Sequence, residues 1–207
     1  RAVLRQILEV RQSFAEQSGC YLQPVCIADS SGVIFNSDGI SEDTIHSVMR
    51  ARARGERIIS LPGARQTKSL NEIIIPGSVI VDVTASGEML KLLRAAYEQG
   101  CRIVLANKKP VAAPWSEAYW LFENSDVRYE ATVGAGLPII STLRQLRETG
   151  DRILAVEGCM SGTLGFICAE LERGVPYSEA IRDAKSLGYT EPDPRDDLSG
   201  QDVARKA

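Results

Sequence analysis

The chemically richest part of the sequence is the segment of residues 188–206, which gathers acidic and basic side chains around two prolines, Pro192 and Pro194. These prolines restrict the loop, which lowers the entropy lost when a small polar ligand is held. Asp202 and Lys206 are four residues apart and share one face if the chain there is helical. A lysine held between carboxylates and a substrate hydroxyl can carry a proton when its surroundings tune its pKa. The same spacing also fits a capped helix with a surface ion pair, and spacing alone favours that plainer interpretation.

Three further polar turns follow segments that we expect to be β-strands. The turns consist of Asp29, Ser30 and Ser31; of Thr84, Ala85, Ser86 and Gly87; and of Asn107, Lys108, Lys109 and Pro110. Ligands of an open parallel sheet bind where its strands end at their carboxyl edges. All three turns are therefore candidate binding segments.

The first turn is compatible with two kinds of cofactor. An acidic side chain about 20 residues beyond a glycine loop can accept hydrogen bonds from an adenosine ribose, whereas a phosphorylated ribose prefers hydroxyl or basic partners. Asp29 suits the first role, and Ser30 and Ser31 suit the second, so NAD and NADP both stay open. A plain turn, in which Asp29 bonds to its own loop, fits equally well. No G-x-G-x-x-G motif occurs before Arg1, so we expect the first strand and the phosphate loop to lie upstream.

The third turn carries two neighbouring ammonium groups, those of Lys108 and Lys109. At a strand end they can meet the nicotinamide end of a cofactor or polarise a substrate oxygen. Pro110 supports a fixed turn after them. Taken alone, the pair is more typical of surface lysines.

Alternating strands and helices must position these residues. Apolar spacing predicts helices over residues 2–17, 42–54, 88–99, 115–122, 138–148, 163–172 and 177–187. Short apolar runs predict strands over residues 24–28, 78–83, 101–106, 127–132 and 153–160. This alternation indicates an α/β fold with a doubly wound, parallel, Rossmann-like sheet. We expect residues 1–135 to form a nucleotide-binding domain, and residues 136–207 to begin an α+β catalytic, substrate-binding domain.

Composition argues against several other classes of function. The 207 residues include 24 basic and 27 acidic side chains, a net charge of −3, so no surface suited to nucleic acid is expected. The five cysteines are scattered and His46 is the single histidine, which argues against a zinc site and a histidine-based hydrolase. No apolar run of about 18 residues is present, so no membrane span is expected. We expect a cytoplasmic protein, with removal of an organelle address such as a plastid one left open.

Four segments, in this order, resemble homoserine dehydrogenases. They are residues 106–109 (Ala-Asn-Lys-Lys), 130–138 (Glu-Ala-Thr-Val-Gly-Ala-Gly-Leu-Pro), 161–163 (Ser-Gly-Thr) and the acidic segment 188–206. The second and fourth are the most specific, and the match over the first 70 residues is loose. The resemblance implies an NAD(P)-dependent oxidoreductase that interconverts L-homoserine and L-aspartate 4-semialdehyde in the biosynthesis of threonine, methionine and isoleucine.

The resemblance also implies roles for individual residues. Lys206 matches the catalytic lysine, which passes the hydroxyl proton, and Lys108 matches a second functional lysine near the cofactor and the reacting oxygen. The positions implied to bind the substrate or orient the lysine are Glu191, Asp197, Asp202 and Lys108. The positions implied to line the nicotinamide side of the cofactor are Thr84 and Ala106.

A monovalent cation and a homodimer follow from the same resemblance. The family holds the cation, usually sodium, with backbone carbonyls at positions matching Glu130, Val133, Ala135 and Leu137. Glycines allow such a tight turn, although they suit the start of a helix equally well. Family members continue well beyond Ala207 and build their dimer there, which leaves open whether this segment alone is active.

Two alternatives remain on the same fold. One is another amino-acid or semialdehyde dehydrogenase, because a shared fold does not fix the chemistry. The other is a non-catalytic nucleotide-binding module, in which Lys206 and Glu191 would tolerate alanine without loss of function.

Overall fold

The computed structural model describes residues 1–66, 69–190 and 194–206. The chain divides into two compact units, Arg1–Pro76 and Gly77–Ala207, and each is described by itself. The predicted domain boundary between residues 135 and 136 lies inside the second unit and stays a prediction.

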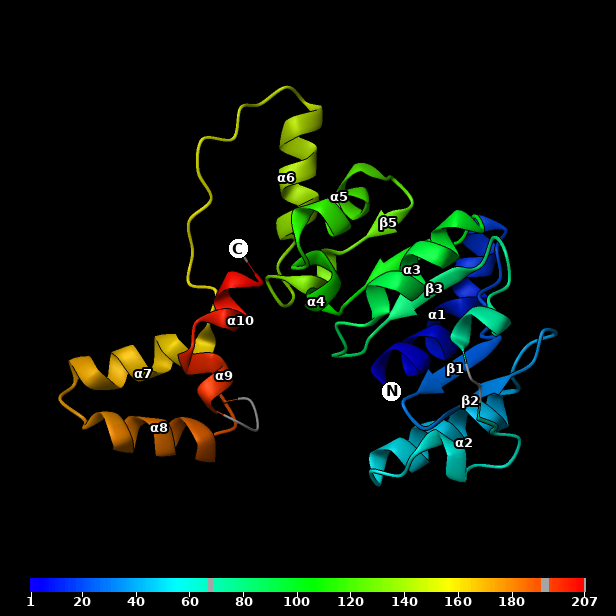
Figure 1. Ribbon diagram of the computed structural model, residues 1–207, viewed down its shortest axis with the longest axis horizontal. Helices are drawn as coiled ribbons and strands as arrows, with labels where there is room; N and C mark the ends of the chain where they lie inside the picture. The colour runs from blue at the N-terminus through cyan, green and yellow to red at the C-terminus, as the bar shows by residue number, and fades with distance from the viewer. Residues whose placement is uncertain (67–68, 191–193, 207) are drawn as a thin grey trace. The chain divides into compact units, whose positions relative to one another are not determined.

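The first unit packs helices onto a two-stranded hairpin (Figure 1). Its elements are α1 (Ala2–Ser18), β1 (Cys26–Asp29), β2 (Gly32–Phe35), α2 (Glu42–Ala53) and the short 3-10 helices η1 (Ile58–Ser60) and η2 (Leu70–Ile73). Its core is formed by Ile34, Ile40, Ile45, Val48 and Ile58, against which Leu4 and Leu8 of α1 pack. Apolar burial therefore joins both helices to the hairpin.

Local signals set the ends of these helices. Gly19 follows α1 in the left-handed conformation, with φ of 70°, which a residue without a Cβ adopts readily. Ser41 begins α2 by accepting a hydrogen bond from the N–H of Thr44, and Glu42 and Asp43 stabilise its first turn through the helix dipole. The predicted helices over residues 2–17 and 42–54 are thus confirmed.

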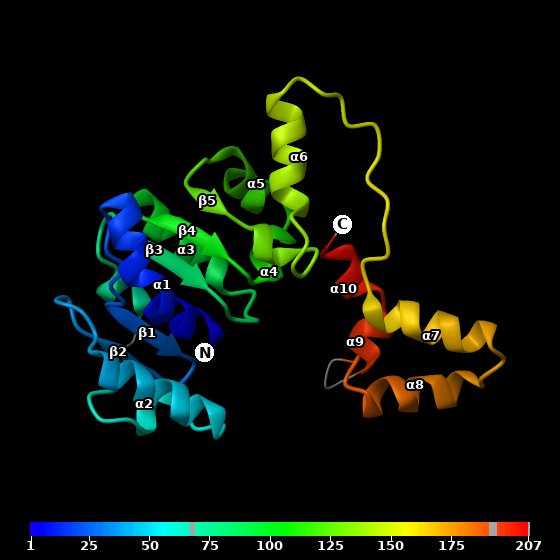
Figure 2. The same ribbon diagram turned by 180° about the vertical axis from the view of Figure 1, so that it is seen from behind.

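The second unit contains a parallel sheet in the order β3-β4-β5 (Figure 2). Its elements are β3 (Val79–Asp82), α3 (Met89–Glu98), β4 (Arg102–Leu105), α4 (Lys108–Val111), α5 (Trp115–Glu123), β5 (Val127–Arg128), η3 (Glu130–Thr132), α6 (Ile139–Glu148), α7 (Gly162–Glu172), α8 (Tyr177–Ser186), α9 (Pro194–Leu198) and α10 (Gln201–Ala204). Leu93, Ile103, Leu105 and Leu121 are fully buried between the sheet and its helices. The predicted mixed α/β fold with a parallel sheet is confirmed.

Beyond the sheet, α7 and α8 lie side by side (Figures 1 and 2). They bury Ile167 against Ala180 and Ala184, where small side chains allow close approach. Leu198 of α9 packs on the same cluster. The acidic segment therefore contains the short helix α9, which contacts this helix pair.

The strand predicted over residues 24–28 is confirmed as β1, but its place in the parallel sheet is not. It pairs antiparallel with β2 through the turn Ser30–Ser31, because the buried run directly after that turn supplies its partner. The strand predicted over residues 153–160 was wrong. Residues 153–160 form no strand in the described structure, and Ile153, Leu154 and Val156 are exposed. An isolated segment forms no stable strand when no second backbone satisfies its N–H and C=O groups. The strand over residues 127–132 is also shorter than predicted, because it ends at Arg128 and is followed by η3.

Among the described residues, no helix combines the length and apolar character needed to cross a bilayer.

Candidate active site

A carboxylate from the C-terminal part of the second unit joins two lysines. Asp202 on α10 forms an ion pair through Oδ1 with Nζ of Lys108, which begins α4. Its other oxygen, Oδ2, lies 2.6 Å from Nζ of Lys206, one turn further along. Both lysines predicted to act in catalysis are therefore brought to a single carboxylate.

This cluster is largely removed from solvent. Asp202 is only 7% exposed, and both lysine side chains are about three-quarters covered. Burial alone would raise the pKa of Asp202, but hydrogen bonds and charges from Lys108 and Lys206 lower it below its ordinary value. Asp202 is therefore the fixed negative charge between two cations.

Lys206 has a second anchor on another segment. Its Nζ donates to the backbone carbonyl oxygen of Met160 at 2.9 Å. Met160 directly precedes Ser161, which begins α7 by accepting a hydrogen bond from the N–H of Leu164. The Ser-Gly-Thr segment thereby fixes the carbonyl that orients the lysine.

A buried polar network lies beneath the neighbouring strand ends. Asp82, the last residue of β3, is 1% exposed, and Asn107, two residues after the end of β4, is 2% exposed. The side-chain amide of Asn107 donates to Oδ2 of Asp82 at 3.0 Å and to the carbonyl oxygen of Ser86 at 2.7 Å. Sequence analysis assigned Asp82 no role and named Asn107 only as a member of the lysine turn. The available signal was a carboxylate in an apolar strand and an asparagine at a helix start.

The turn after β3 is folded by its own hydrogen bonds. The N–H of Thr84 donates to Oδ1 of Asp82 at 2.9 Å, and the N–H of Ser86 donates to Oγ1 of Thr84 at 3.2 Å. Thr84, Ala85 and Ala106 are exposed, whereas Ser86 is half-buried. The predicted cofactor positions of this unit thus lie together on the carboxyl ends of β3 and β4, above the buried network.

The predicted ribose-binding turn belongs to the first unit. The carboxylate of Asp29 accepts hydrogen bonds from the N–H of Ser31 at 2.8 Å and from the N–H of Ile58 at 3.1 Å. Arg52 lies 3.3 Å from the same carboxylate, and Ser30 is exposed. Burial would raise the pKa of Asp29, but the bonds from Ser31 and Ile58, with the charge of Arg52, lower it. Asp29 therefore already stabilises its own loop, as a plain turn would.

The remaining predicted substrate residues differ in how they are placed. Asp197 is buried, and its Oδ1 lies 3.2 Å from the hydroxyl of Thr163 in the Ser-Gly-Thr segment. That hydroxyl also donates to the carbonyl oxygen of Tyr189, which ties the acidic segment to α7. Glu191 lies outside the described residues.

The predicted cation turn is tightly folded. Gly134 and Ala135 both have positive φ, of 80° and 51°. The carboxylate of Glu130 accepts hydrogen bonds from the N–H groups of Ile140 and Ser141, at 3.0 and 2.7 Å, in the first turn of α6. The carbonyl of Leu137 accepts the N–H of Ile139 at 2.9 Å. The described residues contain no cluster of three or more His, Cys, Asp or Glu side chains that could hold a metal, so cation binding here would rest on backbone oxygens.

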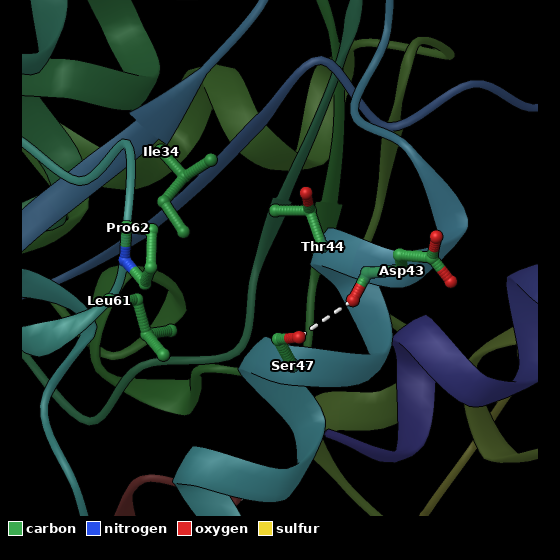
Figure 3. A pocket seen from close by; sticks show the side chains of 6 residues that line it. All are labelled: Ile34, Asp43, Thr44, Ser47, Leu61 and Pro62. Carbon is green, nitrogen blue, oxygen red and sulfur yellow. Dashed lines mark hydrogen bonds between the residues drawn. The ribbon is translucent and has the colours of Figure 1, made fainter.

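The pocket in Figure 3 lies in the first unit, whereas the lysine cluster belongs to the second. It is lined by Ile34, Asp43, Thr44, Ser47, Leu61 and Pro62. The hydroxyl of Ser47 donates to the backbone carbonyl of Asp43 at 2.8 Å, an ordinary bond within α2. His46, on the same helix, is exposed. None of the predicted site residues lines this pocket.

Comparison with known proteins assigns the chain to a family. The family model described as homoserine dehydrogenase matches residues 138–207. A chloroplastic bifunctional aspartokinase/homoserine dehydrogenase 1 from Arabidopsis thaliana is 37% identical across 99% of this chain. The chain belongs to the homoserine dehydrogenase family. The homoserine dehydrogenase of Saccharomyces cerevisiae is 45% identical over 62% of the chain.

Solved structures agree with this assignment. A hyperthermophilic archaeal homoserine dehydrogenase in complex with NADPH has a TM-score of 0.70 and 26% identity, and covers 95% of this chain. The chain spans 22% of the Arabidopsis relative, 38% of the yeast relative and 62% of the archaeal structure. It therefore corresponds to part of the length of each homoserine dehydrogenase relative.

Proposed function

We propose that the protein carrying this chain is an NADP- or NAD-dependent homoserine dehydrogenase, which interconverts L-homoserine and L-aspartate 4-semialdehyde in the biosynthesis of threonine, methionine and isoleucine. The observation that carries this proposal is the bridge from Lys108 through Asp202 to Lys206. It joins the lysine turn, at the end of a sheet strand, to the acidic segment that is most specific to the family. The relatives and the NADPH complexes support the same activity.

The strand ends suit a nicotinamide cofactor. Thr84, Ala85 and Ala106 are small and exposed, which leaves room for a flat ring, and the network below them fixes their backbone. A bound nicotinamide cofactor would supply hydride chemistry at this edge. Lys108 begins the adjacent helix and would face the reacting oxygen. Asp29 and Ser30 of the first unit are proposed to contact the adenosine ribose of the cofactor.

The lysine cluster accounts for the proton that must move. Oxidation of an alcohol to an aldehyde removes a hydride from carbon and a proton from oxygen. Lys206 would carry that proton away from the substrate oxygen during oxidation and return it in the reverse direction. Asp202 holds the lysine in place, and Glu191 with Asp197 would position the amino end of the substrate.

Homoserine oxidation by the full-length protein tests this proposal, followed by the absorbance of the reduced cofactor with NADP and NAD in separate reactions. We expect Lys206→Ala to lower kcat by roughly 10²–10⁴-fold, the usual contribution of a general acid or base. Lys109→Ala is the matched control, because Lys109 is exposed and adjacent to the site, and it should keep near-normal turnover. A folded wild-type protein that oxidises homoserine with neither cofactor would refute the proposal.

We also infer a structural sodium ion at the turn formed by Glu130, Val133, Ala135 and Leu137. The positive φ values at Gly134 and Ala135 support it, because they bend the backbone enough to gather several carbonyls. Unfolding in sodium chloride and in choline chloride of equal ionic strength tests the ion. A sodium-specific rise in melting temperature is expected, and equal temperatures would contradict it.

A homodimer is the assembly that we propose for the full-length protein. Leu137, Leu146, Leu154 and Val156 are exposed apolar side chains in this chain, and such surface favours association. Light scattering of the full-length protein should give twice the monomer mass, whereas a monomer would contradict the proposal. We place the protein in the cytoplasm, or in a plastid if it shares the chloroplast location of its plant relatives.

A further inference from the structure

We propose that Asn107 is a positioning residue that holds the cofactor-side turn and the lysine turn in one arrangement. This inference rests on the proposed function and assigns a role to a residue that would touch neither substrate nor cofactor. Its basis is the set of contacts that the buried amide makes with two strand ends.

The amide nitrogen of Asn107 reaches three acceptors at the end of β3. They are Oδ2 of Asp82 at 3.0 Å, Oγ1 of Thr84 at 3.2 Å and the carbonyl oxygen of Ser86 at 2.7 Å. An amide has only two hydrogens to donate. The carboxylate of Asp82 and the carbonyl oxygen of Ser86 are the stronger and closer acceptors, so they take the two hydrogens. The hydroxyl oxygen of Thr84, at 3.2 Å, shares one of these hydrogens.

The other contacts of Asn107 fix the lysine turn. Its Oδ1 accepts the N–H of Lys109 at 3.1 Å and so begins α4. Its backbone N–H donates to the carbonyl oxygen of Asp82 at 3.2 Å. Lys108 stands between these two anchored positions, and its ammonium group pairs with Asp202. One side chain thereby connects the turn at Thr84–Ser86 to the lysine that faces the reaction.

The site requires an amide at this position. Aspartate would place a second carboxylate against Asp82 and could not donate to the carbonyl of Ser86. An apolar residue would leave the buried carboxylate of Asp82 without its side-chain donor, which is costly in a site that is 1–2% exposed. Asparagine satisfies donor and acceptor demands together.

The test compares Asn107→Asp with Asn124→Asp in the full-length protein. Asn124 is a matched control in the same unit, since it precedes β5, at the opposite end of the strands, and hydrogen-bonds to Tyr97 and Trp120. NADPH fluorescence gives the dissociation constant, and homoserine turnover gives kcat. We expect Asn107→Asp to weaken NADPH binding by about tenfold and to lower kcat, because one to two buried hydrogen bonds are lost. Asn124→Asp should lower the melting temperature and leave both quantities unchanged.

The exchange variant, which combines Asp82→Asn with Asn107→Asp, provides a rescue. The amide would then stand on β3 and donate to the carboxylate on the lysine turn, so NADPH binding should be stronger than in Asn107→Asp alone. If Asn107→Asp, like Asn124→Asp, lowers only the melting temperature, Asn107 is merely structural and the inference fails. If the wild type binds NADPH without oxidising homoserine, the proposed function fails, while weaker NADPH binding in Asn107→Asp would still uphold the positioning role. Absence of NADPH binding in the wild type would overturn both.

Discussion

The turns that follow β1 and β4 are both polar, but their polar groups make different contacts. In the turn after β1, the carboxylate of Asp29 bonds to Ser31 and Ile58 of its own unit. In the turn after β4, the buried side chain of Asn107 donates a hydrogen bond to Asp82, and Lys108 extends to Asp202. The first turn stabilises a hairpin loop, whereas the second joins distant segments into a candidate catalytic cluster.

The difference shows why a polar turn after a strand is weak evidence of catalysis. A short carboxylate readily bonds to backbone N–H groups one or two residues away, so its capacity is used locally. The ammonium group of a lysine lies at the end of a long side chain, so it can reach a partner from a distant part of the sequence. The chemistry of the second turn therefore depends on a tertiary contact, because Lys108 and Asp202 are 94 residues apart in the sequence.

The largest effect on stability and turnover is expected from removing the charge of Asp202, the long-range partner of Lys108 in the second turn. Asp202→Asn would leave two lysines without their shared charge in a partly covered site. We expect the free energy of unfolding to fall by about 1–3 kcal/mol, the value of hydrogen bonds to charged groups. We expect kcat/KM to fall by a factor that corresponds to at least the same free energy, about tenfold or more. Urea unfolding and steady-state kinetics measure the two losses.

Asp126→Asn is the control for that substitution. Asp126 pairs with Arg102 at 3.3 Å on an exposed surface, so the change should cost less than about 1 kcal/mol and leave turnover intact. An equal cost for both substitutions would contradict the special position of Asp202.

A substitution of Asp29 in the first turn should lower the stability of the fold and leave the catalytic rate unchanged. Asp29→Asn replaces the charged acceptor of two backbone N–H groups and removes the partner of Arg52. We expect the free energy of unfolding to fall by about 1–2 kcal/mol with kcat unchanged. A changed KM for NAD or NADP would add a ribose contact to this structural role. An unchanged stability, measured by urea unfolding, would show that the loop does not depend on the carboxylate.

Acid should reduce the stability that the carboxylates of Asp29 and Asp202 provide. The pKa values of Asp29 and Asp202 are lowered, since their hydrogen bonds and cationic neighbours outweigh burial. Each carboxylate therefore stabilises the fold above its unfolded pKa of about 3.9, and this contribution is lost as the pH falls through the folded pKa. Below about pH 4, the free energy of unfolding should fall more steeply in the wild type than in Asp29→Asn. Identical slopes in a pH series of urea unfolding would disprove the linkage.

The smallest effect on stability is expected within the first turn itself. Ser30 is exposed, so Ser30→Ala should change the free energy of unfolding by less than about 0.5 kcal/mol. Ser31→Ala should cost about 1 kcal/mol, because its hydroxyl bonds to Asp29 and accepts the N–H of Ile59 at 3.2 Å. A raised KM for NADP in Ser30→Ala, with stability unchanged, would identify Ser30 as a cofactor contact. Equal stability losses in the two variants would remove the distinction between them.

Periodicity predicted most of the fold because each helix carries its own signal. Gly19 and Ser41 mark helix ends through local backbone geometry, and the runs at β3 and β4 are apolar enough to indicate buried strands. The hairpin of β1 and β2 was missed because its partner choice depends on which apolar run packs nearest, not on either run alone. Residues 153–160 have strand-like composition, yet strand formation needs a second backbone.

The site was predictable only in part. Lys108 and Lys206 were identified by resemblance, but their junction at Asp202 is a tertiary contact that no local pattern specifies. Asn107 and Asp82 are 25 residues apart and look like an ordinary helix cap and a strand end in the sequence. Their importance follows from burial, which periodicity does not report for single polar residues.

A double-mutant cycle tests most directly whether Asp202 makes the two lysines one catalytic unit. It compares kcat/KM for homoserine oxidation in the wild type, Lys108→Ala, Lys206→Ala and the double variant of the full-length protein. Residues that act as a unit are strongly non-additive, so the double variant should lose about as much activity as the more damaged single variant. Losses that simply add would show that the lysines act independently, and would contradict the account.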